Sequence, residues 1–176
     1  MKIILAFGLL FLSSFAWAQQ KTVNTTNGDK PFVEVDISGS SGNYNGQTYT
    51  EMHVGVNLNF TDWLTWRNTG FKRFGTTATQ EATGLDSSLR LGVDTKFDMG
   101  SIKLFAGPGY RWATPSTKNA LFAEAGATIQ LGGLSFGGGA KYLRYDSAQF
   151  DSTGVETKRD DMSYFITVAG GAGLTF

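Results

Sequence analysis

One histidine and a set of charged residues are the side chains of this sequence that could do chemistry. His53 follows Glu51 by two residues, so both side chains lie on the same face of an extended strand. An imidazole beside a carboxylate could relay protons or form half of a hydrolytic site. The sequence has no second histidine and no His-x-Ser pair. We therefore expect His53 to be a hydrogen-bonded structural residue and the protein not to be an enzyme.

The other charged residues recur on one face of the predicted strands, with both signs in near balance. Charges that share a narrow interior must pair, because an unpaired buried charge is costly. The formal net charge is +0 and there is no cysteine, so we expect no nucleic-acid partner, no thiolate metal site and no cofactor. The predicted charge network consists of Glu34, Asp36, Glu51, His53, Arg67, Asp86, Arg90, Asp94, Lys96, Lys103, Arg111, Glu124 and Lys141.

A period-two alternation of apolar and polar residues predicts the strands that would position these charges. In one segment, for example, Met52, Val54 and Val56 alternate with Glu51 and His53. The pattern predicts eight antiparallel strands near residues 32–43, 48–60, 64–74, 85–97, 102–113, 119–131, 134–147 and 160–176. The third segment (64–74) and the fifth (102–113) fit the expected strand pattern poorly. We expect a bulge near Asn68–Gly70 and a bulge or local bend near Pro108, because proline cannot donate to a sheet ladder.

The breaks between strands alternate in length. Those at Thr61-Asp62, Met99-Gly100 and Gly132-Gly133 are tight, whereas those at 75–84, 114–118 and 148–159 are longer and polar. Asn45-Gly46 is a strong hairpin signal that pairs Tyr44 with Gln47 and Ile37 with Val54. The turn at 99–100 pairs Phe97 with Ile102, and the turn at 132–133 pairs Leu131 with Leu134. This arrangement predicts an all-β, eight-stranded, up-and-down barrel.

The charged face could point outward, as in a soluble barrel of lipocalin type, or inward, as in a membrane barrel. Balanced charge interleaved with glycine favours the inward arrangement. The interior of an eight-stranded barrel is so narrow that large charged side chains must alternate with small residues such as glycine. Aromatic residues on the apolar face gather near both ends of the strands, as in the two girdles of a membrane barrel. The predicted girdle residues are Phe60, Trp63, Phe97, Phe136 and Phe176 toward the tight turns, and Tyr44, Phe74, Tyr110, Trp112, Tyr142 and Tyr164 toward the longer loops.

The first residues read as a targeting segment. Lys2 precedes an apolar run that is shorter than the roughly 20 residues of a membrane-spanning helix. Ala16 and Ala18 form a small-x-small cleavage signal. We expect a signal peptide at 1–18, a flexible periplasmic leader at 19–31 and the barrel at 32–176.

The signal sequence, the eight-segment meander and the closing strand, which ends in Leu174 and Phe176, resemble the small outer-membrane barrel families of the OmpA-transmembrane and OmpX/Ail-like kind. The resemblance implies a Gram-negative outer-membrane protein of the cell envelope. It implies that Leu174 and Phe176 form the signal read by the barrel-assembly machinery. Implied partners are outer-membrane lipid, lipopolysaccharide and periplasmic chaperones, and we expect a monomer.

Three functions are consistent with such a barrel. The first is a non-enzymatic structural or surface-interaction role in adhesion or envelope integrity, with the interior closed by salt bridges and loops 75–84 and 148–159 as the contact surface. The second is a narrow, porin-like channel for small solutes. The third is a lipid A-modifying enzyme that uses His53. The first is the function that we expect.

Overall fold

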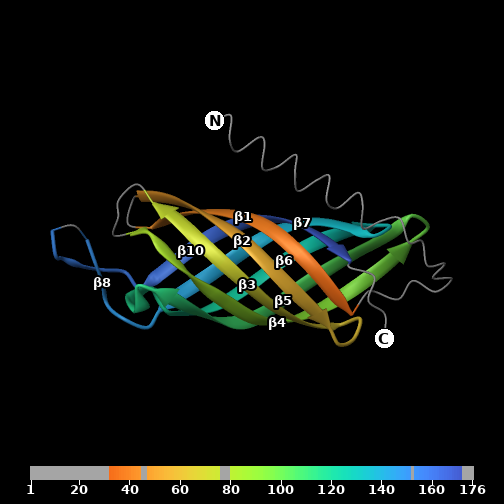
Figure 1. Ribbon diagram of the computed structural model, residues 1–176, viewed down its shortest axis with the longest axis horizontal. Helices are drawn as coiled ribbons and strands as arrows, with labels where there is room; N and C mark the ends of the chain where they lie inside the picture. Colours follow the sequence, from red (N-terminus) through yellow and green to blue (C-terminus); the bar gives the residue numbers. More distant parts are fainter. Residues whose placement is uncertain (1–31, 45–46, 76–79, 152, 172–176) are drawn as a thin grey trace.

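The computed structural model describes residues 32–44, 47–75, 80–151 and 153–171, and it confirms the predicted eight-stranded antiparallel barrel (Figure 1). Strand lengths of 12 to 16 residues allow each strand to run the length of the barrel. The barrel strands are β1 (Val33–Tyr44), β2 (Gln47–Asn59), β3 (Leu64–Gly75), β4 (Ala82–Phe97), β5 (Gly100–Thr114), β6 (Ala120–Leu131), β7 (Leu134–Tyr145) and β10 (Asp160–Gly171).

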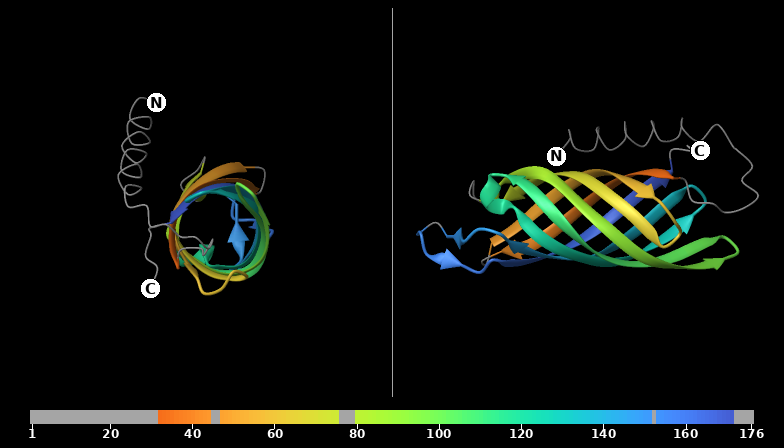
Figure 2. Two further views of the ribbon diagram at one scale, coloured as in Figure 1. Left: turned by 90° about the vertical axis from the view of Figure 1, so that its right-hand side faces the viewer. Right: turned by 90° about the horizontal axis from the view of Figure 1, so that it is seen from below.

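Each strand pairs with its neighbours in the chain, and β1 pairs with β10 to close the ring (Figure 2). Followed once round the ring, the registers return to β1 about ten residues further along, a stagger that tilts the strands. One end of the barrel carries the tight turns; we call it the turn end. The other, the loop end, carries the 3-10 helix η2 (Ser116–Lys118) and the hairpin of β8 (Gln149–Phe150) and β9 (Glu156–Thr157).

Two of the three predicted hairpin registers are confirmed. Tyr44 pairs with Gln47, and Leu131 pairs with Leu134. The third is wrong by two residues, because Phe97 pairs with Gly100 across a turn at 98–99. A shift of two residues keeps every side chain on its predicted face, so the alternation could not detect it.

The expected bulges are absent from the described strands. β3 pairs with β2 and β4 in one continuous register, so Asn68 and Lys72 lie on the outer face with Trp66. The β4–β5 register is the same on both sides of Pro108, and only two pairs are missing, between Ser88–Gly109 and Leu91–Ala106. Proline has no N–H to donate, and the ladder is interrupted there without an inserted residue.

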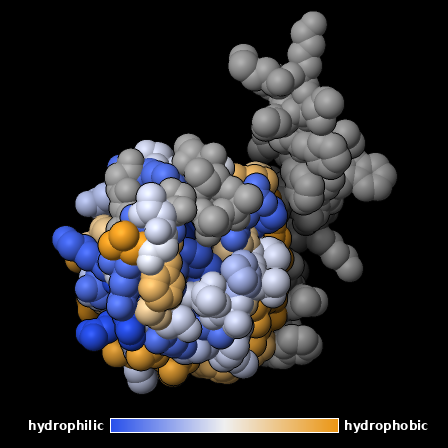
Figure 3. All heavy atoms as spheres, turned by 90° about the vertical axis from the view of Figure 1, so that its left-hand side faces the viewer, coloured by the Kyte–Doolittle hydropathy of each residue, from blue (hydrophilic) through white to orange (hydrophobic). Residues whose placement is uncertain are grey.

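The barrel is polar inside and apolar outside. Glu51 and Arg111 are almost fully buried, at 2% and 1% exposure, whereas Val93 and Ile166 on the outer face are 72% and 74% exposed. Figure 3 views the loop end, where hydrophilic residues gather and hydrophobic residues line the margin. No helix among the described residues is long and apolar enough to cross a membrane.

Candidate functional site: the buried charge network

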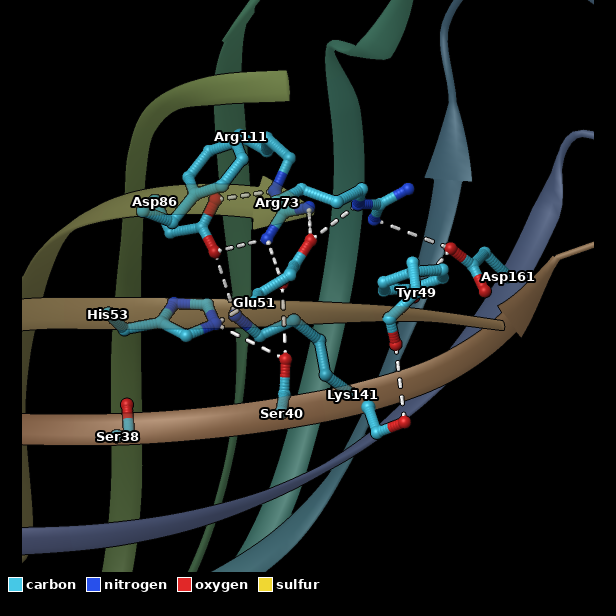
Figure 4. Close-up of polar contacts among 12 residues, drawn as sticks. Ser38, Ser40, Tyr49, Glu51, His53, Arg73, Asp86, Arg111, Lys141 and Asp161 are labelled. Atoms are coloured by element: carbon cyan, nitrogen blue, oxygen red, sulfur yellow. Dashed lines mark hydrogen bonds and ion pairs between the residues drawn. The ribbon is translucent and has the colours of Figure 1, made fainter. Parts of the chain in front are cut away.

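Glu51 is the centre of the charge network in the loop half of the barrel (Figure 4). Its Oε1 accepts hydrogen bonds from Arg73 Nε at 2.7 Å and from Arg111 Nη1 at 2.7 Å, while its Oε2 accepts from Arg111 Nη2 at 3.1 Å. The three residues stand on β2, β3 and β5, and inward alternation aims each of them at the barrel axis. The carboxylate therefore joins strands that are not all neighbours.

Asp86 extends the network to the other side of the interior. It accepts from Arg111 Nε at 2.7 Å and from Lys141 Nζ at 2.8 Å. Arg111 thus bridges two carboxylates, and its guanidinium also lies over the Phe71 ring at 3.9 Å from the centroid. Planar, multidentate pairing of this kind fixes geometry as well as charge.

A tyrosine layer closes the network toward the loop end. Asp161 accepts from Tyr49 Oη at 2.7 Å and from Tyr145 Oη at 2.9 Å. Arg73 donates to Tyr145 Oη at 2.7 Å and stacks on the Tyr49 ring at 3.8 Å from its centroid. Large side chains in contact with one another therefore fill this half of the interior.

His53 is buried beside Glu51 but is not part of a catalytic triad. Its Nε2 lies 3.2 Å from Glu51 Oε2 and 3.3 Å from Ser40 Oγ. A relay needs the acid on one ring nitrogen and the hydroxyl on the other. Here one nitrogen faces both groups, and Nδ1 has no hydrogen-bond partner in the described part of the chain. The geometry of His53 therefore differs from that of a Ser-His-acid relay.

Two ion pairs cross the middle of the interior. Arg67 donates to Asp36 at 2.9 and 2.7 Å. Arg90 donates to Glu124 at 2.8 and 3.0 Å, and that carboxylate also accepts from Ser88 Oγ at 2.6 Å. Both pairs are bidentate and buried, so they separate the loop half from the turn half.

The turn half is less filled and holds a cavity of about 60 Å³, enough for a few water molecules. Neutral side chains from several strands line it, among them Asn57, Thr65 and Thr128. Of the predicted network, Glu34, Arg90 and Lys103 line this cavity, and Lys103 Nζ donates to Thr65 Oγ1 at 3.0 Å. Asp94 is half-buried nearby on β4, and Lys96 is exposed at the turn end rather than buried in the network.

The loop end carries a buried lysine, Lys118, that was not predicted from the sequence as part of the charge network. Lys118 Nζ donates to Gln149 Oε1 at 2.8 Å and lies 5.4 Å from the centroids of the Tyr44 and Tyr145 rings. Burial, reinforced by repulsion from Arg73, lowers the pKa of Lys118 to about 8 despite the opposing attraction of Asp161. This contact joins η2 to the start of the β8–β9 hairpin.

Sequence reasoning missed several members of the network: Arg73, Tyr49, Lys118, Tyr145 and Asp161. Arg73 has the same strand parity as Arg67, and the expected bulge between them hid that signal. Asp161 lies at the start of β10, directly after the longer break at 148–159. The interior is also less purely polar than expected, because four phenylalanines point inward: Phe71, Phe105, Phe122 and Phe165.

The predicted girdle residues that the structure describes lie on the outer face with one exception. Tyr44 is wrong: it is 6% exposed and points inward, where its hydroxyl contacts the Lys158 carbonyl. Tyr110 is half-buried and donates to Asp146. The remaining residues are exposed: Phe60, Trp63, Phe74, Phe97, Trp112, Phe136, Tyr142 and Tyr164. Ala16, Ala18, Leu174 and Phe176 lie outside the described residues.

No group of three or more His, Asp or Glu side chains in the described ranges could hold a metal ion. No protein-family model and no curated protein matches the sequence. A search of solved structures found a chain described as "De novo design of transmembrane beta-barrels", with a TM-score of 0.55 and 12% identity. The match covers 81% of this chain and 97% of that chain. At this identity the likeness concerns the fold.

The fold and its interior therefore define the class: a closed, eight-stranded, up-and-down barrel that resembles a transmembrane barrel.

Proposed function

We propose that this chain is an integral outer-membrane barrel with a structural or surface-interaction role. The observation that carries the proposal is the inversion of polarity between its two faces. Outward side chains such as Leu89, Val93 and Ile166 expose half or more of their surface, while paired charges fill the interior. Only a hydrocarbon environment makes such an outer surface favourable, and a closed barrel satisfies every strand without an exposed edge.

The interior is closed to solutes in this proposal. Glu51, Arg73 and Arg111 fill the loop half, and the Arg90–Glu124 pair separates that half from the cavity at the turn end. A narrow channel is the second candidate, and it is favoured only by that cavity. Stable single-channel steps from the unmodified chain in a planar bilayer would support the channel instead.

The loop end is the surface that would meet partners. The β8–β9 hairpin extends beyond the barrel (Figure 1), with exposed Lys158 and Arg159 beside it. These cations would meet the phosphates of lipopolysaccharide, while the outer belt contacts lipid. Assembly would use periplasmic chaperones and the barrel-assembly machinery, with Leu174 and Phe176 as its signal. The proposal includes no enzymatic activity.

Fractionation with a heat-modifiability gel tests the membrane proposal. The whole chain is expressed in a Gram-negative host, and outer membranes are run in SDS with and without boiling. We expect the protein in the outer-membrane fraction, with a mobility shift on boiling, because folded membrane barrels resist SDS. A soluble periplasmic band without a shift would overturn the proposal.

The loop role has its own test. Deletion of residues 150–158 should leave the heat-dependent shift intact, because none of the eight barrel strands includes them. If the deletion abolishes membrane assembly, the hairpin is not a passive surface element.

A further inference from the structure

Asn68 is a polar side chain in the middle of the apolar outer surface. It stands third among the six outward positions of β3, which are Leu64, Trp66, Asn68, Gly70, Lys72 and Phe74. Continuous pairing of β3 with both neighbours fixes this orientation, since a bulge would have turned it inward. The polar residues that interrupt the apolar alternation of β3 therefore lie on the outer surface itself.

Apolar side chains surround Asn68 on both neighbouring strands. In register, Val56 lies beside it on β2, and Val54 lies beside Gly70. On β4, Leu89 pairs with Trp66 and Leu85 pairs with Gly70. These four neighbours, Val54, Val56, Leu85 and Leu89, are between 41% and 58% exposed. The amide therefore sits inside the belt that the proposed function places in hydrocarbon.

Within the described part of the barrel, one polar side chain of this region has a hydrogen-bond partner, but the Asn68 amide has none. Ser87, opposite Asn68 on β4, accepts a hydrogen bond from Trp66 Nε1 at 2.8 Å. Among the described residues, no hydrogen bond is made to the Asn68 side chain. A polar side chain without a partner in hydrocarbon is unfavourable, and such residues mark contacts with another polar group.

An asparagine amide both donates and accepts, so two copies related by a two-fold axis can satisfy each other. Gly70, two residues after Asn68 on the same face, has no side chain, and the nearest atom to a Cβ built there is the Val54 carbonyl oxygen at 3.8 Å. Small residues beside a polar one allow close approach between proteins in a membrane. A second copy of this chain therefore supplies both the amide and the space.

We propose that the outer face of β3 around Asn68 and Gly70 is a contact between two copies of this chain in the membrane, with paired Asn68 amides at its centre. The proposal rests on the proposed membrane location and revises the monomer expected from the sequence. We infer a second copy of the chain as the partner from the chemistry of the Asn68 amide rather than from apolar surface area alone.

Cysteine crosslinking tests this contact, because the natural chain has no cysteine. The whole chain carrying Gly70→Cys is purified from membranes, reconstituted into dimyristoylphosphatidylcholine vesicles and oxidised. We expect a disulfide-linked dimer. Adding Asn68→Leu should weaken association by roughly tenfold, whereas Asn68→Gln should retain it. Leucine suits a lipid-facing position, so the Asn68→Leu barrel should still fold.

Ala140→Cys is the matched control. It faces outward near the middle of β7, the strand farthest from β3 round the ring, and should give no dimer. Equal crosslinking from both cysteines, or no effect of Asn68→Leu, would overturn the contact. The heat-dependent shift is recorded for every variant. A barrel that inserts but stays monomeric overturns only this inference, whereas a chain that does not insert overturns the proposed function as well.

Discussion

Arg111 donates to both oxygens of Glu51, at 2.7 and 3.1 Å, although the two residues stand on β5 and β2, which do not pair. The contact therefore spans the interior rather than following the sheet. It ties together parts of the ring that backbone hydrogen bonds do not join directly, and Arg73 of β3 shares the same carboxylate.

Replacing the shared carboxylate should be costly. Glu51→Gln keeps the shape but leaves Arg73 and Arg111 without their common anion, so we expect a loss of about 3 kcal/mol in the free energy of unfolding. Urea unfolding in lipid vesicles measures it. Glu81→Gln is the control, because the Lys72–Glu81 pair is exposed and 3.8 Å long and should contribute below about 1 kcal/mol. Equal losses for the two variants would show that the network is not what stabilises the barrel.

Opening the interior requires removal of the groups that fill it. The double variant Glu51→Ala, Arg111→Ala deletes a matched pair of charges, so it should produce open levels in a planar bilayer while the unmodified chain gives none. Lys72→Ala, Glu81→Ala is the matched surface pair and should stay silent. A folded double variant that never conducts would mean that the two ion pairs across the middle, Arg67–Asp36 and Arg90–Glu124, suffice to close the barrel.

Gly107 belongs to one of the two missing ladder pairs of β4 and β5, and the β4 backbone lies close against it. A Cβ built there would lie 1.8 Å from the Leu89 carbonyl oxygen, whereas one at Gly70 would lie 3.8 Å from the nearest atom. We expect Gly107→Ala to lower the free energy of unfolding by about 1–3 kcal/mol, through forced displacement of the backbone. Gly70→Ala should change it far less. If both variants unfold alike, the close approach at Gly107 does not constrain the strand.

The pKa of Lys118 should lie well below the ordinary value of a lysine. Its pKa of about 8 lies below the ordinary 10.5, so between these values the unfolded chain binds more protons than the folded one. The stability contributed by this group therefore rises with pH across that window. Lysine side-chain NMR in micelles checks the value. Lys118→Met should remove this part of the pH dependence, and a Lys118 signal that titrates near the ordinary 10.5 would contradict the burial.

The alternation of apolar and polar residues determined the fold, because a period of two assigns every side chain to one face of the sheet. The breaks between the alternating segments, one about every ten residues or more, set the number of strands. The alternation predicts that Glu51, His53, Asp86 and Arg111 share one face of the sheet. The Asn45-Gly46 turn also fixed the β1–β2 register, because a two-residue hairpin leaves no freedom.

Tertiary structure decided the strand registers and the ion pairs between distant strands, which a local sequence pattern does not specify. The register after Phe97 shifted by two residues without moving any residue to the other face, so the sequence carried no trace of it. Ion pairs such as Arg111–Glu51 join strands that are not neighbours, and their choice depends on the stagger of the closed ring. The same holds for Asn68: only an unbroken β3 shows that its amide faces outward, because pairing with both neighbouring strands outweighs the local preference of one polar residue.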